Sequence, residues 1–428
     1  MITLYYTLII VALAVFTITA WRNFYFALAI FFFILPTYLI RFYLGPLPTT
    51  FLEIMIGIIF LAWLGKIGPK QIRSSLADYY RQYSTLFWAV GLFLTGATIA
   101  VFTAINFRAA LGEWKAFYVE PVIIFLIVIT ACGQDKKYAN RILFALILGG
   151  LVTAILAVYQ YFTGWLVPYS FWENRHTYRV TGWYGFPNAV GLFLAPLFML
   201  AIYYVKKMFG NNQETATKNQ TMLLFFPFSL LAIWYAKSTG ALVGIIAGIG
   251  FLLLLWPKTR WFAMITGALL LLSLILLPNN ALKQELLLED QSGQLRVEMW
   301  GETIEFLKTR PVLGAGLASY SARIAPYRIN KAIEIFHHPH NIFLTMWVNI
   351  GLIGLIGFVW ILIWFFHVAW HRQAHYLAAA MVTWVTTGLV DSPYIKNDLA
   401  IVFWLLPALL LIHSTLDKKQ KIYGLANP

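Results

Sequence analysis

Residues 310–358 read RPVLGAGLASYSARIAPYRINKAIEIFHHPHNIFLTMWVNIGLIGLIGF, and they pass directly from a basic, histidine-containing segment into an apolar one. The apolar run continues to residue 366, which exceeds the roughly 20 residues that a helix needs to cross a bilayer. Pro339, His340 and Asn341 stand at the junction. This stretch therefore predicts a membrane-spanning helix with a titratable imidazole at its mouth, and we expect catalysis there.

The composition extends this prediction to the whole chain. Of 428 residues, 61% are hydrophobic and only 11% are charged, whereas a soluble domain is apolar in about half of its residues. Backbone groups in lipid must bond to one another, which favours helices. We predict an all-α polytopic membrane protein with about 12 or 13 transmembrane helices. The expected helices cover residues 2–20, 23–40, 50–65, 86–105, 116–132, 142–162, 186–205, 222–236, 240–256, 261–277, 341–366, 376–390 and 399–414.

The chain contains no stretch that indicates a separate soluble domain. We expect a single integral membrane domain over residues 1–428, and the only long loop covers residues 278–340. The first apolar segment lacks a charged start and a small-residue cleavage site, so we interpret it as a retained helix and not as a removed signal peptide. Cys132 is the only cysteine, which excludes an internal disulfide and a cysteine metal cluster.

The net charge of +14 does not indicate nucleic-acid binding, because the basic residues form no single stripe. They gather in alternate loops, as the preference of cytoplasmic loops for Lys and Arg predicts. The clusters assigned to the cytoplasm are Lys66 to Arg81, Lys136 to Arg141, Lys206 and Lys207, Lys258 and Arg260, Arg372, and Lys418 to Lys421. Alternation then places residues 163–185, 278–340 and 391–398 on the external face, with the C-terminus inside.

The long loop contains one segment with a helical pattern, from Gln294 to Lys308. Apolar residues fall on one side and glutamates on the other: Trp300, Ile304 and Leu307 against Glu298, Glu302 and Glu305. At roughly 100° per residue this is an amphipathic helix, and Arg296 shares the apolar arc. The guanidinium either reaches water from a snorkelling stem or binds phosphate through its fork of donors. Arg323 and Arg328 in the same loop are weaker candidates for the same role.

His340 is the candidate general base, because a neutral imidazole accepts a proton near neutral pH. Asn341 is the expected N-cap of the helix that follows. His337 and His338 lie next to it and raise the alternative of a zinc site, but no HExxH pattern or cysteine set completes one. A capping or interfacial histidine without a catalytic role is the other alternative.

Three further external turns carry polar residues. Arg175 and Arg179 precede a Pro-Asn helix start, and either is a candidate to share an anionic ligand with Arg296 or to anchor headgroups. Lys237 places a cation in the KSTG turn, and the following glycines at four-residue spacing predict close helix packing. Asp391 lies in the DSPYIKND turn, where it either orients a base or binds an acceptor hydroxyl; we expect a solvated turn.

Several segments together resemble the O-antigen ligase and Wzy-type polymerase superfamily of bacterial membrane glycosyltransferases. The resemblance spans most of the chain. Its segments, in chain order, are RVTGWYGFPNAVGLFLAP, KSTGALVG, LRVEMWGETIEFLKTRPVLGAGL, PHNIFLTMWVNIGLIGLIGF and DSPYIKNDLAIVFW. It implies that an acceptor hydroxyl attacks a glycan carried on polyprenyl, usually undecaprenyl, pyrophosphate. By the matching motifs, it implies that His340 activates the acceptor and that Arg296 binds pyrophosphate. One departure is that many relatives have Ser-Arg-Gly where this chain has Ser238-Thr239-Gly240, with Lys237 nearby.

The resemblance implies an enzyme of the bacterial inner membrane that works at its periplasmic or extracellular face with no cofactor, metal or nucleotide sugar. The acceptor is lipid A-core or a protein in a ligase, and another lipid-linked repeat in a polymerase; both branches share these motifs. The alternative from another class is a lipid-linked sugar flippase or other transporter. Transporter sites usually lie near the bilayer midplane, whereas the notable polar residues here gather at one face, which favours the transferase.

Overall fold

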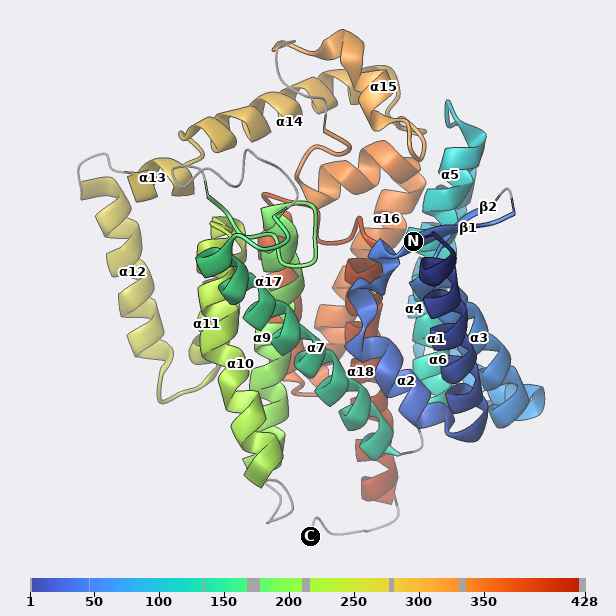
Figure 1. Ribbon diagram of the computed structural model, residues 1–428. Coiled ribbons are helices and arrows are strands. Elements are labelled where there is room, and N and C mark those ends of the chain that lie inside the picture. Colours follow the sequence, from blue (N-terminus) through green and yellow to red (C-terminus); the bar gives the residue numbers. More distant parts are fainter. Residues whose placement is uncertain are drawn as a thin grey trace.

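A computed structural model describes residues 2–45, 47–133, 135–167, 178–209, 216–276, 281–330 and 336–422. These residues form a helical bundle with a helical layer across one end (Figure 1). The first half contributes α1 (Ile2–Arg22), α2 (Phe24–Phe33), α3 (Phe51–Ile67), α4 (Pro69–Phe102), α5 (Phe107–Glu113), α6 (Glu120–Cys132) and α7 (Lys136–Thr163). The second half contributes α9 (Pro187–Phe209), α10 (Ala216–Tyr235), α11 (Thr239–Leu255), α12 (Arg260–Leu276), α13 (Ala281–Leu286), α14 (Gln291–Thr309), α15 (Tyr320–Ile324), α16 (Ile342–His371), α17 (His375–Gly388) and α18 (Asn397–Ile422).

The helical membrane fold predicted from the composition is confirmed. Every predicted transmembrane stretch overlaps a described helix, although α2 ends at Phe33 within the predicted stretch 23–40 and a short 3-10 helix follows it. Six of the described helical segments are long and apolar enough to span a membrane. These are Thr3–Arg22, Pro69–Phe102, Phe107–Cys132, Lys136–Thr163, Pro187–Lys206 and Ile342–His371. Shorter apolar helices, such as Thr239–Leu255 and Asn397–His413, complete the bundle.

The structure differs from the sequence prediction at two places near the amino end. Residues 69–85, predicted as loop, belong to α4, which begins after Gly68 and is broken at Tyr83 (φ −135°, ψ 40°). The charged residues of this first part give it a polar face, which hides the helix from a hydropathy reading. A two-stranded antiparallel hairpin, β1 (Arg41–Leu44) and β2 (Leu47–Thr50), was also not predicted.

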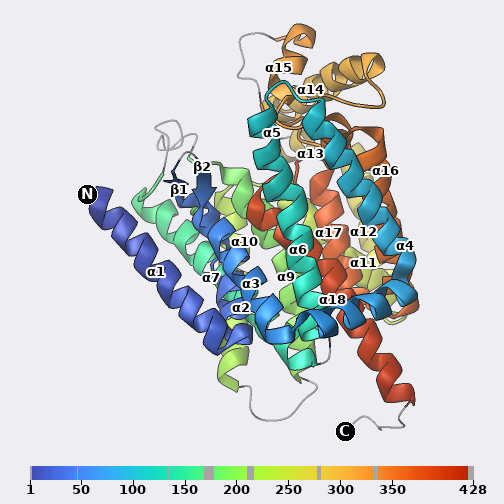
Figure 2. The same cartoon turned by 90° about the vertical axis from the view of Figure 1, so that its right-hand side faces the viewer.

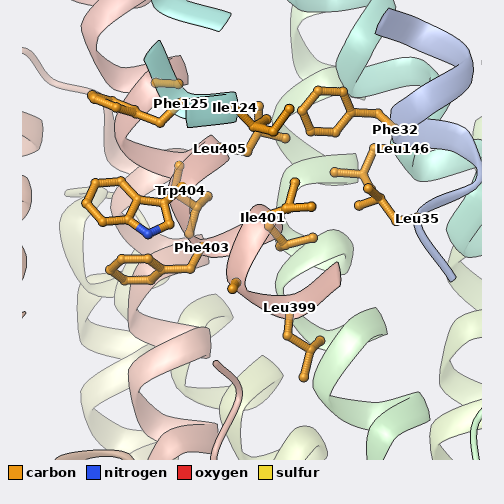
Figure 3. Packing of buried hydrophobic residues seen from close by; sticks show 14 of the residues in the cluster. Phe32, Leu35, Ile124, Phe125, Leu146, Leu399, Ile401, Phe403, Trp404 and Leu405 are labelled. Atoms are coloured by element: carbon orange, nitrogen blue, oxygen red, sulfur yellow. The ribbon is translucent and has the colours of Figure 1, made fainter. Parts of the chain in front are cut away.

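The core is built around α18, whose residues 397–412 are all buried. A helix that is apolar around its whole circumference belongs in the interior of a bundle. Figure 3 shows Phe403, Trp404 and Leu405 of this helix packed among residues of neighbouring helices, including Phe125 and Leu146. The loop from residue 389 to residue 396, which immediately precedes α18, is therefore attached to the most buried helix of the molecule.

The long loop folds into the layer across the end of the bundle, made of α13, α14 and α15 (Figure 1). The predicted amphipathic helix is confirmed as α14, which begins earlier than predicted because Asp290 caps the amides of Ser292 and Gly293. Its predicted faces are partly wrong. Glu302 is buried because it accepts a hydrogen bond from the Ile329 amide at 2.7 Å, and Ile304 is 44% exposed.

Two close contacts hold α11 and α16, the helices that follow the polar turns at Lys237 and His340. The glycine spacing of α11 packs it against α17, as predicted: a Cβ on Gly244 would lie 2.2 Å from Thr387 Oγ1. In α16 the chain is broken at Gly351 (φ 68°). The Leu352 amide there bonds to Val312 O at 2.8 Å, which ties α16 to the loop that follows α14.

The two views place the start of α1 at the end of the bundle nearer the α13–α15 layer and the end of α18 at the opposite end (Figures 1 and 2). An odd number of crossings gives this arrangement, which is the parity of the larger predicted number of helices, 13. The orientation of the bundle in the membrane stays a prediction.

Candidate functional site

The loop before α16 holds His340 in an uncommon backbone conformation. Its φ is 50°, in the left-handed region that a non-glycine residue rarely occupies. The carbonyl of the preceding Pro339 accepts a hydrogen bond of 2.8 Å from the indole of Trp300 on α14. Such backbone strain persists only where the surroundings hold it, and it is common at functional sites. The α14 helix therefore holds the backbone immediately before His340 through the Trp300 hydrogen bond.

Asn341 holds the backbone immediately after His340. Its side-chain oxygen accepts from the amides of Phe343 and Leu344 at 3.0 and 3.1 Å, which confirms the predicted N-cap of α16. Its amide nitrogen donates to Leu389 O at 3.0 Å. One side chain thus joins the start of α16 to the loop that carries Asp391.

His340 and Asp391 form the central pair of the site. His340 Nδ1 lies 3.0 Å from Asp391 Oδ1. The aspartate side chain is 8% exposed and the histidine side chain 18% exposed, so the imidazole reaches the surface while the carboxylate does not. An ionised carboxylate only accepts hydrogen bonds, so Nδ1 carries the proton and the lone pair is on Nε2. This is the tautomer that a general base needs.

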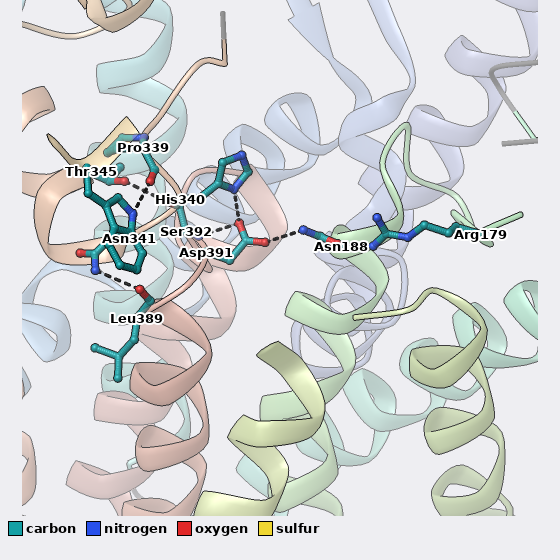
Figure 4. A network of polar contacts seen from close by, with 10 residues as sticks. Arg179, Asn188, Pro339, His340, Asn341, Thr345, Leu389, Asp391 and Ser392 are labelled. Carbon is teal, nitrogen blue, oxygen red and sulfur yellow. Dashed lines mark hydrogen bonds and ion pairs between the residues drawn. The ribbon is translucent and has the colours of Figure 1, made fainter. Parts of the chain in front are cut away.

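A network of donors keeps Asp391 ionised and oriented. Its second oxygen accepts from Asn188 Nδ2 at 2.9 Å, and Oδ1 also accepts from the Ser392 amide at 2.8 Å (Figure 4). Burial alone would raise the pKa of Asp391. The charge and hydrogen bond of His340, with the charge of Arg296, outweigh burial and hold that pKa below its ordinary value. The prediction of a solvated turn is wrong, because the carboxylate is an internal ligand of the imidazole.

Arg179 extends this network toward α10 and α11. Its Nη2 donates to Asn188 Oδ1 at 2.5 Å and to Lys237 O at 3.2 Å, and its Nε donates to Ala236 O at 2.8 Å. Burial and then the charge of Arg296 lower the pKa of Arg179 to about 10. The guanidinium therefore stays positive at neutral pH.

Arg296 lies on α14 one turn before Trp300, and its charge acts on both Asp391 and Arg179. Its Nε is buried and has no hydrogen-bond partner among the described residues. A charged donor left unsatisfied in a buried position costs more than the roughly 1–3 kcal/mol of a neutral one. An anion between Arg296 and Arg179 would satisfy that donor and offset the repulsion between the two guanidiniums.

His338 is the second histidine of the cluster. Its ring meets the ring of His340 edge to face, with centroids 4.6 Å apart, and its Nδ1 is buried without a partner in the described chain. Burial and then the charge of His340 lower the pKa of His338 to about 3. His338 is therefore neutral at neutral pH and adds no positive charge beside the base.

Among the described residues, one set of side chains has the donor atoms for a metal ion: His338, His340 and Asp391 offer ligand atoms within 4.8 Å of one another. The Asp391 oxygens, however, already accept from His340, Asn188 and the Ser392 amide. With these partners the carboxylate supports the imidazole, and the absence of a metal stays a prediction.

The other predicted residues have different surroundings. Lys237 is exposed, and what reaches the network is its backbone carbonyl, at a residue with φ of 48°. Arg323 bonds to Ala315 O and Thr103 O. Arg328 lies 3.9 Å from Glu302 and donates to Asn330 O. Arg175 lies outside the described residues.

The sequence prediction missed two residues of the site. Asn188 links Asp391 to Arg179, and Trp300 holds the loop of His340. The Pro187-Asn188 helix start, which resembles the start of α16, was the available signal for Asn188. The partner of the Trp300 indole is a backbone carbonyl, and no sequence pattern marks it.

A family model described as O-antigen ligase matches residues 224–359. The match includes Lys237, Arg296 and His340, and it ends before Asp391. It confirms the resemblance to the O-antigen ligase and Wzy-type polymerase superfamily that the sequence motifs indicate. No curated protein matches the chain. Together with the membrane helices, the family match supports a membrane glycosyltransferase.

Proposed function

We propose that this protein transfers a preassembled glycan from polyprenyl pyrophosphate, such as undecaprenyl pyrophosphate, to an acceptor hydroxyl at the external face of the bacterial inner membrane. The observation that carries the proposal is the chain of contacts from His340 through Asp391 and Asn188 to Arg179, with Arg296 beside it. These contacts support the proposal, because a base can act on a hydroxyl nucleophile and two cations can act on a phosphate leaving group.

His340 supplies the base in this mechanism. Nε2 accepts the proton of the acceptor hydroxyl while the oxygen attacks the anomeric carbon, and the bond from that carbon to the pyrophosphate oxygen breaks with both electrons leaving on the pyrophosphate. The imidazole becomes positive during this step, and the fixed negative charge of Asp391 stabilises it. A positioned base of this kind contributes about 10²–10⁴-fold to the rate.

Arg296 and Arg179 act on the leaving group. Negative charge grows on the pyrophosphate as the bond breaks, and cations fixed before the reaction stabilise that charge without reorganisation. A guanidinium fork such as that of Arg296 matches phosphate oxygens, and the Arg179 guanidinium adds a second fixed positive charge. Arg179 is itself held by Asn188 and by two backbone carbonyls, so it enters the reaction with its orientation set.

The acceptor and the length of the product distinguish the two branches of the superfamily. A lipid A-core acceptor that gains one glycan in one step identifies a ligase. A ladder of products built on lipid-linked repeats identifies a polymerase.

The test is transfer by the purified protein in proteoliposomes that contain a polyprenyl-pyrophosphate oligosaccharide and a candidate acceptor, with products separated on a gel. We expect transfer in the presence of a metal chelator and without nucleotide sugar. Movement of the donor across the bilayer without transfer to any acceptor would replace this proposal with a transport function.

A further inference from the structure

A second pair of arginines lies at the other end of α14. Arg310 follows the last residue of the helix, and its carbonyl accepts from the Gly314 amide at 3.0 Å. Arg323, on α15, donates from Nε to Ala315 O at 3.1 Å and from Nη2 to Thr103 O at 3.2 Å. The turn from residue 310 to residue 315 therefore begins at Arg310 and binds the Arg323 guanidinium at Ala315, and Thr103 connects Arg323 to the end of α4.

One donor of this pair lacks an acceptor. Arg310 Nη1 is buried and has no hydrogen-bond partner among the described residues. Burial and then the charge of Arg310 lower the pKa of Arg323, so the two guanidiniums repel each other. Glu113 accepts from the Ala318 amide at 2.8 Å, three residues beyond this turn. An anion between the arginines would offset the repulsion and satisfy the Arg310 donor.

The position of the pair along α14 indicates which substrate would bring that anion. Trp300 contacts the loop of His340, Arg296 lies four residues before Trp300, and Arg310 lies ten residues after it. At 1.5 Å per residue these separations are about 6 Å and about 15 Å along the helix axis, in opposite directions. Along α14, the contact with the loop of His340 therefore lies between the two arginine sites, and the proposed reaction has two substrates that must meet at the base.

We propose that Arg310 and Arg323 bind a phosphate group of the acceptor, while Arg296 and Arg179 bind the pyrophosphate of the donor. This inference rests on the proposed function for the assignment of the two substrates. The forked guanidinium matches phosphate oxygens with parallel hydrogen bonds. Loss of one charged hydrogen bond of this kind costs about 1.5–3 kcal/mol, which weakens binding by about 10- to 150-fold.

The kinetic test compares one acceptor before and after enzymatic removal of its phosphate. With the phosphorylated acceptor, Arg310→Gln and Arg323→Gln should each raise the acceptor KM by about tenfold or more, with kcat and the donor KM unchanged. With the dephosphorylated acceptor, the variants should match the wild type. The matched control is Lys308→Gln, which removes a charge from the same end of α14 at a side chain that is 63% exposed. Equal KM values for both acceptors in the wild type would overturn the proposal.

A binding test separates failure of this proposal from failure of the proposed function, because it needs no transfer. Inorganic phosphate is titrated into protein held in nanodiscs of neutral lipid, and the thermal unfolding midpoint is followed against chloride at equal ionic strength. We expect Arg296→Gln to retain a phosphate-dependent rise in the midpoint and Arg296→Gln/Arg310→Gln to lose it. No difference between the two variants would contradict the site. Loss of the response to phosphate in nanodiscs with phosphatidylglycerol would assign the site to a lipid headgroup and overturn the acceptor assignment.

Discussion

Replacing Asp391 by asparagine keeps the size of the side chain and removes the negative charge 3.0 Å from His340 Nδ1. The change affects the base in two ways. It removes the charge that stabilises the imidazolium formed when the acceptor is deprotonated. It also permits the asparagine amide to donate to Nδ1, which would move the proton of the neutral ring to Nε2 and occupy the lone pair that catalysis needs.

The magnitude follows from the type of contact. A hydrogen bond to a charged group contributes about 1.5–3 kcal/mol, and each 1.36 kcal/mol in the barrier is about tenfold in rate. We therefore expect kcat to fall by about 10- to 150-fold if the tautomer is kept, and by up to about 10⁴-fold if the base is lost. The donor KM should change little, because the carboxylate oxygens bind protein groups.

The assay is the initial rate of glycan transfer in proteoliposomes at saturating donor and acceptor, with equal amounts of folded protein. The control is Asp78→Asn, which removes one carboxylate from a side chain that is 72% exposed and should leave the rate unchanged. An Asp391→Asn variant that folds and transfers at more than one third of the wild-type rate would refute the role of Asp391 as the residue that positions the base.

Four further predictions test other contacts. Arg296→Lys keeps the positive charge but loses the forked pair of guanidinium donors, so we expect the transfer rate to fall by about tenfold. The rate of Arg296→Gln, which also loses the charge, should be lower still, and single-turnover transfer measures the rates of both variants. Trp300→Phe removes the hydrogen bond to Pro339 O, which contributes about 1 kcal/mol. We therefore expect kcat to fall a few-fold in steady-state kinetics, with the KM of the glycan donor unchanged. Asn341→Ala removes the N-cap of α16 and should cost about 1 kcal/mol of stability, seen as a lower unfolding midpoint. The lowered pKa of Asp391 stabilises the fold above pH of about 4, and this contribution is lost as the pH falls through the folded-state pKa; the midpoint difference between wild type and Asp391→Asn should therefore shrink on acidification.

Helix positions were predictable from the sequence because lipid imposes one requirement on every span. Backbone groups must bond within the segment and side chains must be apolar, so hydropathy marks the segment directly. Hydropathy did not reveal the first part of α4, because that part is a polar helix. It did not reveal the β1–β2 hairpin either, because strands of four residues show no clear alternation of apolar and polar residues.

The candidate site was predictable where one residue carries its own signal. His340 stands at a change from polar to apolar sequence, and Asn341 has the side chain of an N-cap. Arg296 is a cation on the apolar arc of a periodic helix. These three signals are local, and a single sequence contains them.

The support of the base was not predictable by the same means. Asp391 lies 51 residues from His340 and 203 residues from Asn188, so its pairing depends on how α16, α9 and α18 pack. Without that packing an aspartate beside Ser392 and Pro393 has the features of a solvated turn. The predicted faces of α14 were partly wrong for a related reason, since Glu302 is drawn inward by the Ile329 amide, which helical periodicity does not reveal.

The central claim is that His340 is the base for transfer from a lipid pyrophosphate, and the most direct measurement is the single-turnover rate of His340→Gln beside the wild type. Both proteins are reconstituted with saturating lipid-linked glycan and acceptor, and donor binding is measured on the same samples. The account predicts a rate lower by about 10²–10⁴-fold with donor binding retained. A folded His340→Gln variant that transfers glycan at the wild-type rate would contradict it.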